Sequence, residues 1–163
     1  MSRLNKLAFF LICTIIVYTT MAYGTVHQPT LAFFYFLITI LFLFWSADCL
    51  LNGEVRFSRS VLQIPLFAFG VYGFIQIIPF GTYAEASGIA DIPQTISIEP
   101  YATQVTSVHI LSLCIFFAIA LVYFDNAKRM RKLATFITIF GFVYAFYAIL
   151  QSVLSPTKIY GIY

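Results

Sequence analysis

The sequence predicts an all-α, polytopic membrane protein with about five transmembrane helices, and three observations support this fold class. First, hydrophobic residues make up 61% of the 163 residues and charged residues only 9%, against about 45–50% and about 25% in soluble domains. Second, five separate segments have roughly the 20 apolar residues that cross a bilayer. Third, the basic residues fall in alternate connections between these segments. We therefore expect one membrane domain over residues 1–163, helical because lipid offers no partner for free backbone groups.

The first span is expected at residues 7–23, directly after Arg3 and Lys6. A basic start, an apolar run and small residues near Ala22 and Gly24 are also typical of a cleavable signal peptide. The apolar run is long for a signal peptide, and more spans follow it. We therefore favour an uncleaved anchor, with cleavage as the alternative.

The second and third spans are expected at residues 30–51 and 61–80. Trp45 marks the far boundary of the second span, since Trp favours the interface between membrane and water. Asp48 is predicted just beyond that boundary, in contact with water. Pro79 closes the third span, because proline has no N–H for a helix interior.

The fourth and fifth spans are expected at residues 104–124 and 133–154, after a long polar loop at 81–103. Helices associate in lipid through small side chains that let their backbones approach. Two spans carry such residues, and we predict a close-contact face on each. They are Ala68, Gly70 and Gly73 in the third span, and Gly141, Ala145 and Ala148 in the fifth.

The charges predict the orientation of the spans, because short cytoplasmic loops are enriched in Lys and Arg. One side of the membrane receives Arg3, Lys6, Arg56, Arg59, Lys128, Arg129, Arg131 and Lys132. The other side receives Glu85, Asp91, Glu99 and Lys158. The N-terminus is therefore predicted in the cytoplasm, and the loop at 81–103 and the C-terminus outside. We interpret the run Lys128–Lys132 as an anchor at the interface, with recognition of an anionic membrane lipid as the alternative.

Polar residues within the spans are few, and no Asp, Glu, Lys or Arg lies in the middle of a span. Transporters and pumps usually need ionisable groups at depth, so this pattern argues against a complete transporter. Gln76, His109 and Gln151 all fall in the outer halves of their spans. They can either line one polar pocket beneath the outer loop or each bond a neighbouring helix or interfacial water, and we favour the second interpretation.

The sequence shows no catalytic constellation, so no catalytic, cofactor-binding or metal-binding residue is predicted. His27 and His109 have no ligand partners at metal spacing, and the three acidic residues of the outer loop are ordinary in a solvated segment. No nucleotide-binding motif is present, and a net charge of +3 does not indicate a nucleic-acid partner. The cysteines follow no disulfide or metal pattern and are interpreted as small apolar side chains: Cys13, Cys49 and Cys114.

A series of short phrases follows in order from Ile64 to the end of the chain. They are IPLFAFGVYGFIQIIPF with Gln76 and Pro79, Ser97-Ile98-Glu99-Pro100-Tyr101-Ala102-Thr103, a basic turn with Arg129 and Arg131, GFVYAFYAILQ with Gly141, Ala145 and Gln151, and Ile159-Tyr160-Gly161. This series resembles the N-terminal part of the O-antigen ligase and O-antigen polymerase family of bacterial membrane proteins. Such proteins transfer glycan from undecaprenyl pyrophosphate to an acceptor at the outer face of the inner membrane.

The resemblance implies a bacterial inner-membrane glycosyltransferase that uses no metal. The important Arg and His residues of the family lie in later periplasmic loops, so no catalytic residue is carried over. His27-Gln28 matches two letters of one family motif but lacks its glycine and lies in another loop. We therefore expect a fragment that is inactive alone and needs the C-terminal half, with ligase and polymerase both open. The alternative is a non-catalytic scaffold or subunit that packs against a partner membrane protein.

Overall fold

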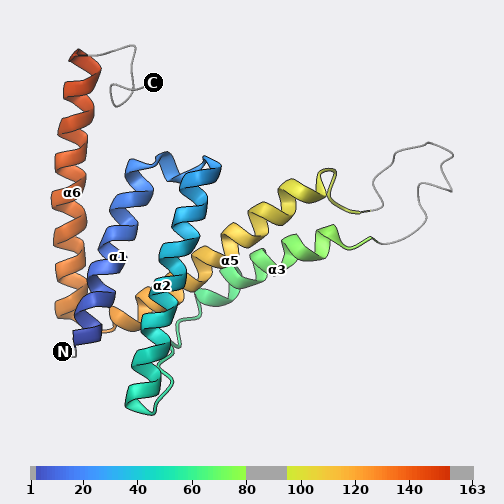
Figure 1. Ribbon diagram of the computed structural model, residues 1–163, viewed down its shortest axis with the longest axis horizontal. Helices are drawn as coiled ribbons and strands as arrows, with labels where there is room; N and C mark the ends of the chain where they lie inside the picture. The colour runs from blue at the N-terminus through green and yellow to red at the C-terminus, as the bar shows by residue number, and fades with distance from the viewer. Residues whose placement is uncertain (1–2, 80–94, 155–163) are drawn as a thin grey trace, which may run out of the picture.

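The computed structural model describes residues 3–79 and 95–154, and these residues are mainly helical (Figure 1). Within these two ranges, four helices are long and apolar enough to cross a membrane: α1 (Arg3–Met21), α2 (Gln28–Asn52), α5 (Pro100–Tyr123) and α6 (Ala127–Leu154). The predicted all-α membrane class is confirmed. The third predicted span corresponds to α3 (Gln63–Ile77), a shorter apolar helix of 15 residues that rises about 22 Å.

Two predicted boundaries are wrong, and both errors have a local cause. Helix α5 begins at Pro100, because proline is preorganised for a first helical turn, so residues 100–103 are helical although we expected them in the outer loop. Helix α6 begins at Ala127, where Asn126 accepts the Lys128 N–H through its side-chain oxygen at 2.9 Å. The basic run Lys128–Lys132 therefore forms the first turns of a helix and is not a loop.

The core lies where α1, α2 and α5 meet. The 3₁₀ turn η1 (Tyr23–Thr25) joins α1 to α2, and the Tyr18 hydroxyl donates to the Thr30 carbonyl at 3.0 Å across the two helices. Aromatic contact continues to the end of α5, where the rings of Phe9 and Phe124 lie 5.6 Å apart. The core side chains are Ala8, Ile12, Ile15, Phe34, Leu37, Ile38, Leu41, Ile119, Tyr123 and Phe124.

Helices α3 and α5 form a second hairpin that leans away from α1 and α2 (Figure 1). The predicted contact face of small residues is confirmed for two of its three members. A Cβ atom added at Gly73 would overlap Ser107 Oγ, and one added at Gly70 would lie 2.7 Å from Leu111 Cδ2. The two backbones approach closely because these glycines have no side chain.

Helix α6 runs beside α1 (Figure 1) and buries no residue. A Cβ atom added at Gly141 would meet nothing within 4 Å, and Ala145 and Ala148 are exposed. The contact face predicted for this span is therefore not used within the described part of the chain.

The helices place most basic residues at one end of the molecule. In Figure 1, α1 and α6 start near the end of α5, and α2 ends on the same side. We call this the basic end, and it includes the connection between α2 and α3. We call the opposite end of the α3–α5 pair, where α3 ends and α5 begins, the hairpin end. An antiparallel bridge between Pro79 and Thr95 closes the hairpin end.

Candidate functional site

A cleft of about 390 Å³ lies between α3 and α5 at the hairpin end. We call it the α3–α5 cleft. It brings together residues that are far apart in the sequence, from the end of α3 and the first turns of α5. Its lining residues are Phe69, Tyr72, Gly73, Gln76, Glu99, Ala102, Thr103, Thr106, Ser107 and Ile110.

The segment at 97–103 forms an ordered start to α5 beside this cleft. The Ser97 N–H donates to the Gln76 carbonyl at 3.1 Å and ties the segment to α3. The hydroxyls of Ser97 and Thr103 share a hydrogen bond of 2.7 Å, and the Ser107 hydroxyl donates to the Thr103 carbonyl at 2.7 Å. The Thr103 N–H bonds the carbonyl of Glu99 at 3.1 Å. Two phrases of the predicted resemblance, around Gln76 and at 97–103, thus meet in one place.

The chemistry of the α3–α5 cleft suits a ligand rich in hydroxyl groups. Gln76 offers an amide, Glu99 a carboxylate and Thr106 a hydroxyl, so the wall presents both donors and acceptors. Phe69 and Tyr72 add aromatic surface, on which the apolar face of a sugar ring can lie. Among the described residues that line the cleft there is no Arg or Lys, so it lacks the usual partners of a phosphate.

The structure does not bring Gln76, His109 and Gln151 into one pocket. Gln76 lines the α3–α5 cleft. His109 turns toward α2, where its ring lies 5.4 Å from that of Phe34 and 6.1 Å from that of Tyr35. Gln151 lies near the far end of α6, a helix that runs beside α1 and meets α5 at its first turns, through Arg129. The predicted joint pocket is therefore wrong.

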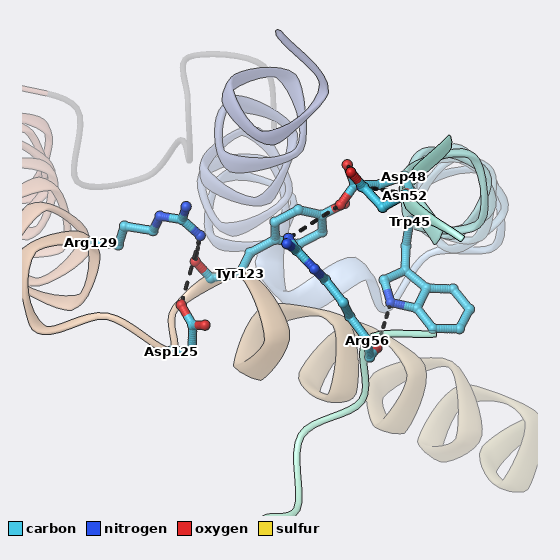
Figure 2. Close-up of polar contacts among 7 residues, drawn as sticks. All are labelled: Trp45, Asp48, Asn52, Arg56, Tyr123, Asp125 and Arg129. Carbon is cyan, nitrogen blue, oxygen red and sulfur yellow. Dashed lines mark hydrogen bonds and ion pairs between the residues drawn. The ribbon is translucent and has the colours of Figure 1, made fainter. Parts of the chain in front are cut away.

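A polar cluster at the basic end corrects the prediction for Asp48. Asp48 lies inside α2 and is only 3% exposed, because α2 continues to Asn52 and the next segment folds back over it. Its Oδ2 atom lies 3.7 Å from Nη1 of Arg56, and its Oδ1 atom accepts from Asn52 at 3.1 Å (Figure 2). The Trp45 ring N–H donates to the Arg56 carbonyl at 3.0 Å. The prediction that Asp48 lies in contact with water is therefore wrong.

A second pair joins the end of α5 to the start of α6. Nη1 of Arg129 donates to the Tyr123 carbonyl at 3.1 Å and lies 3.7 Å from Oδ1 of Asp125 (Figure 2). Unlike Asp48, the Asp125 side chain is 72% exposed. The hydroxyl of the buried Tyr123 has no hydrogen-bond partner in the described part of the chain.

The Asp48 cluster was not predicted, although the sequence carries a signal for it. Asp48, Asn52 and Arg56 follow one another at intervals of four residues, which places successive members on one face while the chain stays helical. An acidic residue in an apolar helix is costly unless it is paired. The nearest basic residue along the chain was therefore the natural partner.

Other residues singled out in the sequence do not contribute to either polar site. Glu85, Asp91, Lys158 and the phrase at 159–161 lie outside the described residues. His27 precedes α2 and makes no side-chain cap. The cysteines are free, and within 3–79 and 95–154 no group of three His, Cys, Asp or Glu side chains is arranged to hold a metal ion.

Comparison with protein families, with curated proteins and with solved structures gives no match to this chain in any of the three.

Proposed function

We propose that this chain is the membrane-embedded N-terminal part of an O-antigen ligase-like glycosyltransferase. In this proposal it helps transfer glycan from undecaprenyl pyrophosphate to an acceptor at the outer face of the bacterial inner membrane. The observation that supports the proposal best is the α3–α5 cleft. Gln76 and the segment at 97–103, which carry much of the resemblance, line or border the same cavity.

The direction of the helices also supports this assignment. Three chain segments with basic residues lie at the basic end: the start of α1, the connection between α2 and α3, and the start of α6. The positive-inside rule places such an end in the cytoplasm. The α3–α5 cleft then opens at the outer face, where lipid-linked glycan is used. The N-terminus is cytoplasmic and α6 runs outward in this arrangement.

The cleft supports a role in holding glycan and not in stabilising the leaving group. Gln76, Glu99 and Thr106 can exchange hydrogen bonds with sugar hydroxyls. A departing pyrophosphate needs Arg or Lys, and the described lining has neither. The transfer step therefore requires basic groups from elsewhere in the assembled enzyme, and we expect the chain alone to be inactive.

The proposal is tested in the bacterium that encodes the chain. Deleting the coding sequence should raise the pool of undecaprenyl-pyrophosphate-linked glycan and deplete the acceptor-linked glycan. Restoring the gene with Gln76→Leu should recover only about a tenth of the transfer, because a sugar hydroxyl that loses its amide partner is left unpaired, which costs about 1–3 kcal/mol. The measurement is the ratio of the two glycan pools.

The matched control is Gln104→Leu, the same change on an exposed residue of α5 that does not line the cleft. It should restore transfer fully at an equal amount of chain in the membrane. Unchanged glycan pools after deletion would refute the glycosyltransferase proposal.

A second candidate, a membrane scaffold, is favoured by one observation: α6 has 28 residues and buries none of them. A spanning helix with two open sides is suited to packing against a partner membrane protein. Crosslinking from α6 in native membranes distinguishes the two candidates. A scaffold should be captured with a partner whose amount falls when the chain is deleted, while the glycan pools stay constant.

A further inference from the structure

The connection between α2 and α3 doubles back along the last turns of α2. The ring of Trp45 bonds the carbonyl of Arg56, eleven residues later, and Asp48 pairs with the Arg56 side chain. Gly53 permits the reversal, because its φ of 67° is left-handed. Residues 54–62 therefore lie beside the helix end and do not extend away from the molecule.

Two cavities flank this connection and share Phe57 and Ser58 as lining residues. The first is polar, has a volume of about 790 Å³, and is lined by Arg56, Arg129, Asp125 and Asn126 among others. The second is an apolar groove of about 670 Å³ between α3 and α5. Its wall includes Ile64, Phe67, Ala68, Leu111, Cys114 and Ala118, together with Arg59.

We propose that the two cavities bind one anionic phospholipid of the surrounding membrane. Its phosphate lies in the polar cavity between Arg56 and Arg129, with Arg59 nearby, and one acyl chain lies in the apolar groove. The connection between α2 and α3 separates the headgroup from the chain. This site does not depend on the proposed glycosyltransferase activity.

The charges of the basic end are complementary to a phosphate. Arg56 and Arg129 each pair through Nη1 with one carboxylate, and a guanidinium has five donors, so further donors stay available. Arg59 makes no ion pair in the described part of the chain. Lys128, Arg131 and Lys132 at the start of α6 are exposed and line neither cavity.

The surroundings favour a lipid over a free phosphate ion. The residues that alternate with the arginines of the connection are apolar and exposed: Val55 at 77%, Phe57 at 68%, Val61 at 74% and Leu62 at 68%. Exposed apolar side chains around a basic segment are typical of a surface that lies in the membrane interface. A phosphate that reaches these arginines therefore arrives at the level of lipid headgroups.

Trp45 gives a direct test, because it is the only tryptophan and lines a small pocket together with Arg56 and Phe57. The full chain is reconstituted in phosphatidylcholine vesicles that contain phosphatidylglycerol or phosphatidylcholine with brominated acyl chains, at equal mole fraction. Bromine quenches tryptophan at contact range. We expect stronger quenching by brominated phosphatidylglycerol. Arg59→Gln should lower this preference roughly five-fold, the effect of one basic residue at an anionic surface.

The control is Arg131→Gln, which removes the same charge from an exposed position outside both cavities and should change the preference less than about two-fold. Ala68→Phe fills the groove from an exposed position of α3 and should also weaken quenching. Equal quenching by the two lipids would overturn the proposal, as would equal losses in Arg59→Gln and Arg131→Gln. Loss of the preference on adding inorganic phosphate at matched ionic strength would overturn it in favour of a free-anion site.

Discussion

Helix α3 and the apolar part of helix α6 are rich in the same kinds of side chain, but they pack differently. Both are apolar, and both carry small residues on one face. In α3, Gly70 and Gly73 lie directly against α5. In α6, Gly141 has nothing within 4 Å, and the helix buries no residue. The difference shows that a stripe of small residues permits close helix packing but does not by itself cause it.

The partner helix makes the difference. Ser107 and Leu111 of α5 fit the space that the glycines of α3 leave open, and Ser97 ties the start of α5 to the end of α3. Helix α6 is joined to the others mainly at its first turn, through Arg129. The contrast therefore depends on complementary side chains and on anchoring at both ends, and three experiments examine it.

The largest effect is expected from adding a side chain at the α3–α5 contact. Gly73→Val places its Cβ atom on Ser107, and overpacking of this kind costs typically about 1–3 kcal/mol. We expect a lower midpoint of thermal unfolding for the purified chain in detergent. The matched change Gly141→Val meets open space and should lower the free energy of unfolding by less than about 0.5 kcal/mol.

Both substitutions replace a helical glycine by valine, so the change in intrinsic helix propensity is the same in both and cancels when they are compared. Equal midpoints for Gly73→Val and Gly141→Val would show that α3 and α5 do not pack closely, and the comparison would fail.

The parts of the fold that follow from composition and length could be predicted from the sequence. The five apolar segments and the contact at Gly70 and Gly73 are examples, since lipid leaves a backbone little choice but to be helical. The boundaries were less predictable, because Pro100 and Asn126 act through local capping that extends helices into segments of polar sequence. Hydropathy alone places a helix end where the apolar run ends.

The candidate sites were harder to predict, because they depend on how helices face one another. The meeting of Gln76 with the segment at 97–103 requires the path of the α3–α5 hairpin. The burial of Asp48 requires the reversal at Gly53, which no apolar period indicates. His109 faces α2 and not the cleft, since the two faces of α5 contact different helices and its sequence is apolar on both.

A smaller effect is expected from the two ion pairs, which share an N···O distance of 3.7 Å and differ in exposure. Asp48 is 4% exposed at its side chain and Asp125 is 72% exposed. Asp48→Asn should cost about 1–2 kcal/mol, below the range for a fully buried pair because Arg56 is half exposed and regains water. Asp125→Asn should cost less than about 0.5 kcal/mol.

The fluorescence of Trp45 measures the same contrast at one place. Since its ring N–H holds the Arg56 carbonyl, loosening of the connection in Asp48→Asn should increase the quenching of Trp45 by acrylamide. Asp125→Asn should leave it unchanged. If the two variants behave alike, burial does not determine the strength of these ion pairs. The idea that Asp48 anchors the connection between α2 and α3 is then wrong.

The smallest effect is expected on α6 itself, where Phe140 stacks on Phe136 at 6.3 Å and on Tyr144 at 5.9 Å. Such pairs along one helix are worth about 0.2–0.5 kcal/mol each, so Phe140→Leu should hardly change the unfolding midpoint of the purified chain. Phe34→Leu makes the same change in the core, at a ring that is 1% exposed, and should lower the midpoint clearly. The informative step is to compare the amounts of the two variants in native membranes. If Phe140→Leu stays harmless there, α6 faces lipid and the open helix is a property of the working protein. If its amount falls as far as that of Phe34→Leu, a partner protein covers α6 in the cell, and the result favours the scaffold function.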